Sequence, residues 1–273
     1  MCGTCGCSSD ARIMVLTSSE HASVAAHDHG HGENEHSHGD SHARHVHLPD
    51  SAAAGRTIEL QQKVLAKNDG LAAANRQWLR DRGILAVNLM SSPGSGKTTL
   101  LARTTSELAG KMSISVIEGD QETMLDAERI QAAGGRVVQI NTGAGCHLDA
   151  GMVASALAGL DPPGGSVVMI ENVGNLVCPA LFDLGEAGKV VLASVTEGAD
   201  KPLKYPHMFR QADLVLLNKT DLLPYVDFDV RRYSSDLRRV APDAMLLQLS
   251  ATTGDGMQAW YDWLLRRVPP RSG

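Results

Sequence analysis

The feature that most constrains the fold of this chain is a phosphate-binding loop set between an apolar run and a helical pattern. Residues 91–98 read Ser-Ser-Pro-Gly-Ser-Gly-Lys-Thr. They follow the apolar run 84–90 and precede 99–108, which suits a helix. Backbone N–H groups of such a loop, with the N-terminus of the next helix, present positive dipole ends to phosphate. The order strand, loop, helix therefore predicts a P-loop domain, with Ser91 in place of the usual first glycine.

The loop residues have distinct predicted roles. Lys97 should reach the β- and γ-phosphates, and the Thr98 hydroxyl should bind Mg²⁺. The residues expected around the phosphates are Gly94, Ser95, Gly96, Lys97, Thr98 and Thr99.

Further apolar runs alternate with helical patterns along the chain. The runs are nearly continuous in apolar residues, which is typical of parallel strands buried on both faces. We predict an α/β fold with a mostly parallel, doubly wound sheet flanked by helices and ligand chemistry at the carboxyl ends of the strands. The seven candidate strands are 84–90, 114–117, 137–140, 167–170, 190–195, 214–217 and 245–249.

A second motif indicates which base is bound. The run 214–217 leads into Asn218-Lys219-Thr220-Asp221. The Asp221 carboxylate can accept hydrogen bonds from guanine N1–H and the exocyclic amine, a donor pair that adenine lacks. Ser250 and Ala251, after the last strand, resemble the loop that supports guanine O6. The motifs favour GTP and disfavour the alternative of a P-loop kinase.

Two acidic residues at strand ends complete the predicted catalytic set with Lys97. Asp120 is a candidate Mg²⁺ ligand, and Glu171 is expected to hold Mg²⁺-bound water or to orient the attacking water. The N–H of Gly174 is placed to sense the γ-phosphate. Since the sequence shows no evident catalytic glutamine or arginine finger, we expect slow intrinsic GTP hydrolysis.

The first fifty residues are predicted to be a disordered metal-binding tail. They hold nine of the eleven histidines in a background of Gly, Ser, Asp and Glu, with too little apolar surface to offset the entropy of ordering. Cys2, Cys5 and Cys7 offer three thiolates within six residues, a set that suits nickel or zinc. The histidines could store metal or form a solvated spacer.

Residues 51–83 are predicted to be a helical segment in front of a GTPase domain spanning 84–273. Leu60, Val64, Leu71 and Trp78 recur at spacings that place them on one helix face. Gly70 is expected to weaken or break this helix, and Gly83 to end it.

A second candidate metal site lies inside the GTPase domain. Cys146 and His147 follow the third predicted strand, and Cys178 lies four residues after Gly174. These loops can converge at the carboxyl edge of the sheet, and three ligands leave a position open on a four-coordinate ion. Zinc or nickel would suit this set. The alternative is a buried structural cysteine beside an unrelated histidine.

Composition excludes several function classes. The net charge is −6 with no long basic stretch, so nucleic acid is a poor partner. No apolar run approaches the ~18–20 residues that cross a bilayer, and no secretory signal is visible. We therefore expect a cytoplasmic protein without membrane association. Five cysteines, an odd count, argue against a disulfide framework.

Taken together, these motifs resemble the hydrogenase nickel-incorporation GTPases of the HypB family. The resemblance rests on the N-terminal cysteines, on Asn218–Asp221, and on the segments 171–179 and 196–206. It implies a homodimerising GTPase of the signal-recognition/MinD class that uses GTP, Mg²⁺, Ni²⁺ and Zn²⁺. It also implies nickel transfer to [NiFe]-hydrogenase with HypA, a small zinc-containing partner. The three N-terminal cysteines would be the high-affinity nickel site, and Cys146, His147 and Cys178 a weaker site for zinc or nickel.

The residues also allow alternatives in the source of charge and in function. Any positive charge supplied across a dimer could come from Lys201 or Lys204. A urease-type nickel GTPase is an alternative, against which the N-terminal cysteines speak. A metal-storage or sensing protein with a regulatory GTPase is another, and in it residues 11–50 would do the main work.

Overall fold

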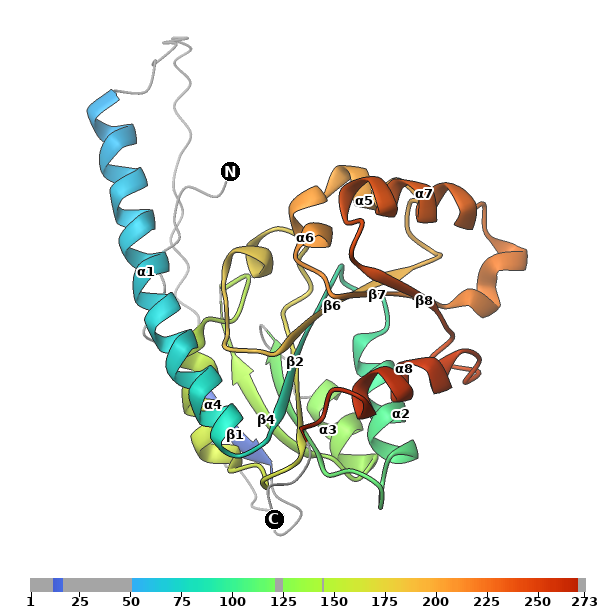
Figure 1. The fold of residues 1–273 in the computed structure, drawn as a ribbon, viewed down its shortest axis with the longest axis horizontal. Helices are drawn as coiled ribbons and strands as arrows, with labels where there is room; N and C mark the ends of the chain where they lie inside the picture. Colours follow the sequence, from blue (N-terminus) through green and yellow to red (C-terminus); the bar gives the residue numbers. More distant parts are fainter. Residues whose placement is uncertain (1–11, 17–50, 121–124, 144, 270–273) are drawn as a thin grey trace, which may run out of the picture.

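The computed structural model describes residues 12–16, 51–120, 125–143 and 145–269 (Figure 1). The predicted N-terminal ligands Cys2, Cys5 and Cys7, and the nine histidines of the tail, lie outside the described residues.

The described strands form one sheet of eight, in the order β1-β4-β3-β5-β2-β6-β7-β8. Every pair of neighbouring strands among β2 to β8 is parallel. Each of the seven predicted runs is a strand. The doubly wound sheet predicted from the apolar runs is therefore confirmed. The bounds are β2 Leu85–Ser91, β3 Ile114–Asp120, β4 Arg136–Asn141, β5 Val167–Glu171, β6 Gly188–Ser194, β7 Leu214–Asn218 and β8 Met245–Gln248.

Helices cover both faces of the sheet, because side chains on each buried strand alternate between two cores. On β2, Val87 and Leu89 pack towards α2, α3 and α8, whereas Ala86 and Met90 face the opposite side. There α1 and α4 cover one half and α5 to α7 the other (Figure 1). The bounds are α1 Ser51–Asp81, α2 Lys97–Glu107, α3 Leu125–Ala132, α4 Ala150–Leu160, α5 Lys201–Lys204, α6 Pro206–Arg210, α7 Val230–Val240 and α8 Met257–Leu265, with 3₁₀ turns η1 Cys178–Leu181 and η2 Thr220–Tyr225.

The eighth strand corrects the prediction of a wholly disordered tail. Strand β1, Arg12–Leu16, pairs antiparallel with β4, from Arg12 opposite Asn141 to Leu16 opposite Val137. Its sequence, Arg-Ile-Met-Val-Leu, is a short apolar run within a polar, low-complexity region. Five apolar-rich residues are enough to add an edge strand to an existing sheet. The prediction missed this strand because it used the average composition of the whole tail.

Helix α1 corrects two further predictions. It runs without interruption through Gly70, so of the expected weakening or break the break is wrong; the residue lies on the exposed side, where no packing side chain is needed. Its fully buried residues are Asn68, Ala72, Asn75 and Leu79, none of which belongs to the predicted stripe, and Leu71 of that stripe is 39% exposed. Val64 and Trp78 of the predicted stripe do pack against the core.

The end of α1 at Gly83 is confirmed. Gly83 has a φ of +62°, and its N–H donates to the Arg80 carbonyl while the Ile84 N–H donates to that of Leu79. This pair of bonds closes the helix and turns the chain into β2. No helix in the described ranges is both long and apolar enough to cross a bilayer.

The two glycines predict opposite effects of the same substitution. Gly70→Ala should stabilise the fold by about 0.5–1 kcal/mol, because alanine lowers the entropic cost of the helix and its Cβ meets no atom within 4 Å. Gly83→Ala should destabilise it by about 1–2 kcal/mol, because a Cβ disfavours the positive φ. Urea denaturation measures both, and a destabilising Gly70→Ala would contradict the continuous helix.

A nucleotide cleft joined to a candidate metal centre

A cleft of about 530 Å³ opens at the carboxyl ends of β2, β3 and β5. The phosphate loop lies on one side and the ends of β3 and β5 on another, with Lys219 at the rim. The residues that line it are Pro93, Gly94, Gly96, Lys97, Thr98, Thr99, Glu118, Gly119, Asp120, Asp126, Arg129, Glu171, Asn172, Val173, Gly174 and Lys219.

The phosphate loop has the backbone that its sequence predicts. Gly94 and Gly96 have φ values of +72° and +99°, and a Cβ on Gly96 would lie 2.6 Å from Asn218 Nδ2. Ser91, the departure from the usual glycine, is the last residue of β2, and its φ is not positive, so a side chain is accommodated there. Its Oγ accepts a hydrogen bond from Lys97 Nζ at 2.7 Å.

The predicted Mg²⁺ ligands and catalytic residues meet at one end of the cleft. Thr98 Oγ1 donates to Glu171 Oε1 at 3.1 Å, and the other Glu171 oxygen is buried without a partner among the described residues. Asp120 ends β3 and also lines the cleft. Hydroxyl and carboxylate oxygens are the donors that Mg²⁺ prefers, so this set fits the ion. Burial lowers the pKa of Lys97, opposed by the charge of Glu171.

Sequence reasoning missed a second buried carboxylate. Glu118 lies opposite Glu171 on the neighbouring strand and is 2% exposed, and its Oε2 has no hydrogen-bond partner among the described residues. Burial, with the Glu171 charge beside it, raises the pKa of Glu118 to about 8, and burial raises that of Glu171 to about 7. The sequence feature that could have indicated Glu118 is its position directly after the apolar residues of a strand.

Helix α3 contributes two more cleft residues that the sequence did not reveal. Arg129 Nη2 donates to Thr99 Oγ1 at 3.4 Å, and its Nη1 lies 3.7 Å from Asp126 Oδ1. A guanidinium therefore borders the phosphate side of the cleft.

The predicted guanine-binding residues form one connected unit. Asn218 donates from Nδ2 to the Ser95 carbonyl at 2.9 Å and accepts from the Ala251 N–H at 2.9 Å. Lys219, with a φ of +61°, donates from Nζ to the Gly94 carbonyl at 2.7 Å. Asp221 Oδ1 is buried without a partner among the described residues. An unsatisfied buried carboxylate oxygen fits the two adjacent donors of guanine.

Ser250 stabilises the last of these loops. Its Oγ accepts from the Thr253 N–H at 3.0 Å, and its N–H donates to the Asp255 carbonyl. The predicted pair of Ser250 and Ala251 thus belongs to a hydrogen-bonded turn, which contacts Asn218 through the Ala251 N–H.

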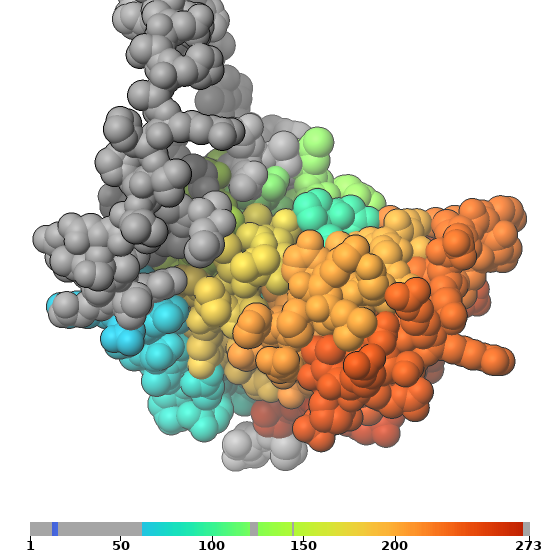
Figure 2. Space-filling model, turned by 90° about the horizontal axis from the view of Figure 1, so that it is seen from above, coloured from blue at the N-terminus to red at the C-terminus, as the bar shows by residue number. Residues whose placement is uncertain are grey.

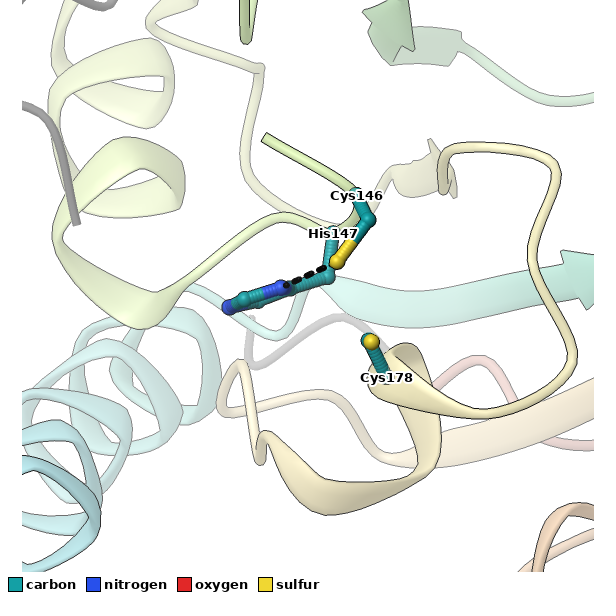
Figure 3. A group of neighbouring side chains, drawn as sticks. All are labelled: Cys146, His147 and Cys178. Carbon is teal, nitrogen blue, oxygen red and sulfur yellow. Dashed lines mark hydrogen bonds between the residues drawn. The ribbon is translucent and has the colours of Figure 1, made fainter. Parts of the chain in front are cut away.

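The three residues of the candidate internal metal centre converge. Cys146, His147 and Cys178 place ligand atoms within 4.8 Å of one another, and their side chains point towards a common space (Figure 3). Cys146 Sγ lies 3.5 Å from His147 Nδ1. Ligand atoms in a tetrahedral zinc site lie roughly 3.3–3.8 Å apart, so a contraction of about 1 Å would close the set around an ion.

The environment of His147 suits a metal ligand. Its ring stacks on Phe182, with centroids 3.9 Å apart. Burial lowers the pKa of the imidazole, opposed by Asp149. A lowered pKa favours the neutral ring, which is the form that binds metal.

One short segment joins the cleft to this centre. From Glu171, whose carboxylate faces Thr98, it passes Gly174 and reaches Cys178. A Cβ at Gly174 would lie 3.1 Å from three atoms of Pro93 in the phosphate loop. Asn175 Nδ2 donates to the Cys146 carbonyl at 3.3 Å. In Figure 2 the yellow region that contains this segment lies between α1 in blue and the orange helices α5 to α7.

Helix α1 supports both metal loops from the other side. Asn75 Nδ2 donates to the carbonyls of Ala150, 2.8 Å away, and Leu184, 3.0 Å away. Asn68 accepts from the Ala150 N–H and donates to the Asp183 carbonyl. These asparagines lie on a face of α1 that the sequence did not predict to be buried. They hold the chain at Ala150, three residues after His147, and at Asp183 and Leu184, directly after Phe182.

The two lysines considered for a role across a dimer differ in setting. Lys201 Nζ donates to Ser92 Oγ at 3.0 Å and lies 3.5 Å from Glu197 Oε2, so it contacts the phosphate loop of its own chain. Lys204 pairs with Asp200 at 2.8 Å on the surface.

Comparisons with known proteins identify the family. A model described as the CobW/HypB/UreG nucleotide-binding domain matches residues 85–248. The hydrogenase maturation factor HypB of Rhizobium leguminosarum bv. viciae is 56% identical over 219 residues, which cover 80% of this chain and 73% of the relative. That of Escherichia coli K12 is 52% identical over 230 residues, 83% and 79% of the two chains.

The chain belongs to the HypB family of hydrogenase maturation factors. Solved structures of HypB agree with the fold. HypB from Archaeoglobus fulgidus superposes with a TM-score of 0.70 at 41% identity, covering 75% of this chain and all of that one. HypB from Helicobacter pylori, solved in complex with nickel, gives 0.69 at 36% identity, covering 76% and 99%. The family resemblance predicted from the motifs is therefore confirmed.

The buried carboxylates of this HypB-family cleft predict a pH dependence. Because the pKa of Glu118 rises from the ordinary 4.5 to about 8 on folding, the folded chain holds an extra proton between these values. Stability without nucleotide and metal should then fall as pH rises from about 4.5 to about 8, by at most about 1.4 kcal/mol per pH unit for one group. Glu171 contributes with the same sign up to about pH 7.

Glu118→Gln should flatten this fall, since the neutral amide has no charge to bury. Urea denaturation at pH 6 and pH 8.5 in the presence of EDTA tests it, with the exposed Glu128→Gln as the matched control. An equal fall in Glu118→Gln and wild type would show that the carboxylate is not buried as described.

Proposed function

We propose that this chain is a GTP-hydrolysing nickel metallochaperone that delivers nickel during maturation of [NiFe]-hydrogenase. The observation that carries the proposal is the shared segment between Glu171 and Cys178. It begins at the carboxylate that receives the Thr98 hydrogen bond and ends at a thiol of the candidate metal centre. A family of hydrogenase maturation factors, one of them solved with nickel, supplies the physiological context.

The proposed hydrolysis uses the residues of the cleft. Lys97 neutralises the β- and γ-phosphates, and the oxygens of Thr98 and Asp120 would hold Mg²⁺, which would offset the negative charge of the phosphates. Glu171 orients the attacking water or a water bound to Mg²⁺. The Gly174 N–H faces the γ-phosphate, so loss of that phosphate releases the segment. We expect a slow intrinsic rate.

Nickel is the proposed cargo of the centre at Cys146, His147 and Cys178. Two thiolates and one imidazole suit nickel or zinc and leave a fourth position for a ligand from a partner or a second subunit. Val177 and Leu181, on either side of Cys178, are 57% and 54% exposed. Exposed apolar side chains beside an incomplete metal site favour contact with another chain.

The wider cycle follows from these sites. We propose a homodimer stabilised by GTP or metal, a HypA-type accessory protein as partner, and the hydrogenase large subunit as direct or indirect recipient, all in the cytoplasm. Cys2, Cys5 and Cys7 would form a separate nickel site. Gene deletion followed by separate hydrogenase and urease assays tests the recipient. Loss of urease activity alone would contradict the proposal and favour the urease-type alternative.

Asp221→Asn should change the base that is bound. The asparagine amide keeps one acceptor for N1–H but meets the guanine amine with a donor, so GTP affinity should fall roughly 10- to 150-fold. Xanthosine triphosphate carries a carbonyl where guanine has its amine, and it should bind the variant better than GTP does. Competition against a fluorescent GDP analogue measures both affinities. Unchanged GTP binding would remove Asp221 from the base site.

Nucleotide state should change nickel affinity. Because coupling free energies between sites are typically ~1–3 kcal/mol, nickel affinity with GDP and with a non-hydrolysable GTP analogue should differ by about 5- to 150-fold. Nickel is titrated into full-length protein with Cys2, Cys5 and Cys7 replaced by serine, which removes the N-terminal thiolates. The nickel binding that is further lost with Cys178→Ser, rather than kept by the tail histidines, reports the internal site. Cys178→Ser in that background should lose both the site and the difference. Equal affinities in the two nucleotide states would contradict the coupling.

A further inference from the structure

The side chain of Asn172 is buried between the nucleotide cleft and the candidate metal centre. It follows Glu171 in the chain and is 1% exposed. Its Oδ1 accepts hydrogen bonds from the Leu148 N–H at 3.2 Å and from the Val173 N–H at 3.0 Å. Leu148 is the residue after His147. One amide oxygen therefore ties the Cys146–His147 loop to the segment that leaves the cleft.

The nitrogen of the same amide reaches the second metal loop through two more side chains. Asn172 Nδ2 donates to Asn88 Oδ1 at 3.3 Å, and Asn88 Nδ2 donates to Glu186 Oε1 at 3.3 Å. Glu186 Oε2 accepts from the Leu184 N–H at 2.7 Å. Leu184 lies two residues after Phe182, whose ring stacks on His147. Both loops of the metal centre are thus bonded to one buried chain of polar groups.

The other end of this series of hydrogen bonds borders the cleft, which Glu171 and Asn172 both line. Asn172 directly follows Glu171, and the Asn172 N–H donates to the Leu89 carbonyl just before the phosphate loop. The Thr98 hydroxyl donates its proton to Glu171 and keeps its lone pairs for Mg²⁺, so an ion bound at Thr98 would act on residue 171 through this hydrogen bond. Buried polar groups are costly to leave unpaired, so a shift at residue 171 moves the partners of residue 172 together rather than breaking their bonds.

We propose that Asn172 is the positioning residue through which the bound nucleotide sets the geometry of the metal centre. The proposal rests on the proposed coupling of nucleotide and nickel and names the side chain that transmits it. The Asn172 amide acts through Leu148, Val173 and Asn88 rather than as a metal ligand.

Helix α1 provides a matched control. Asn75 is also buried, and it donates to Ala150 and Leu184, so it holds the same two loops. It belongs to α1, however, and has no bond to the segment that leaves the cleft. A general loosening of the loops should follow from replacing either asparagine, whereas loss of communication should follow only from replacing Asn172.

The test is nickel titration of full-length protein with Cys2, Cys5 and Cys7 replaced by serine, with GDP or the GTP analogue bound. In Asn172→Ala the ratio of the two affinities should fall to within about twofold of one. In Asn75→Ala both affinities should fall while the ratio stays at the value of the parent. The thiolate-to-nickel absorption should differ between the nucleotides in the parent and Asn75→Ala but coincide in Asn172→Ala.

A second variant covers the case in which Asn172→Ala does not fold. In Asn172→Ser the hydroxyl can still accept from the adjacent Val173 N–H but is too short to reach Leu148, so the ratio should again collapse. Retention of the ratio in a folded residue-172 variant, or its equal loss in Asn75→Ala, would overturn the role of Asn172. A ratio of one in the parent itself would instead refute the coupling in the proposed function, and the present proposal with it.

Discussion

The chain that leaves β5 is held by buried polar contacts on both sides, and the geometry of the two sites depends on them. Glu171 faces the Thr98 hydroxyl, and Gly174 lies so close to Pro93 that a Cβ at this position would press on the phosphate loop. A few residues later the same backbone carries Cys178 to Cys146 and His147. Because this stretch is short and packed at several points, it has little freedom to adjust to one site without affecting the other.

The parallel sheet makes this proximity possible. Parallel strands deliver every following loop to the same edge, and β5 lies next to β2, so the chain after β5 runs beside the phosphate loop. Segments far apart in sequence, such as those around Cys146 and Cys178, thereby meet without any special connection. The asparagines of α1 then fix the outer side of the metal loops.

The sequence predicted what depends on local pattern and left out what depends on tertiary packing. The phosphate loop, the seven parallel strands and the helix end at Gly83 follow from residue type and spacing. Glu118 and Asn172 could not be assigned roles, because each acts through neighbours on other strands. The buried face of α1 was misjudged for a related reason. Asn68 and Asn75 are polar, and only the carbonyl and N–H groups opposite them make their burial favourable.

Strand β1 lies close to a glycine of α4. A Cβ on Gly159 of α4 would lie 3.2 Å from Val15 Cγ2, so the hydrogen atom at this position leaves room for the strand beside the helix. Within the described residues, β1 is the outermost strand on that side and has five residues, and so short an edge offers little template for pairing with another sheet. A larger residue at Gly159 would press on Val15, and any loss of β1 would leave the longer β4, Arg136–Asn141, open to such pairing.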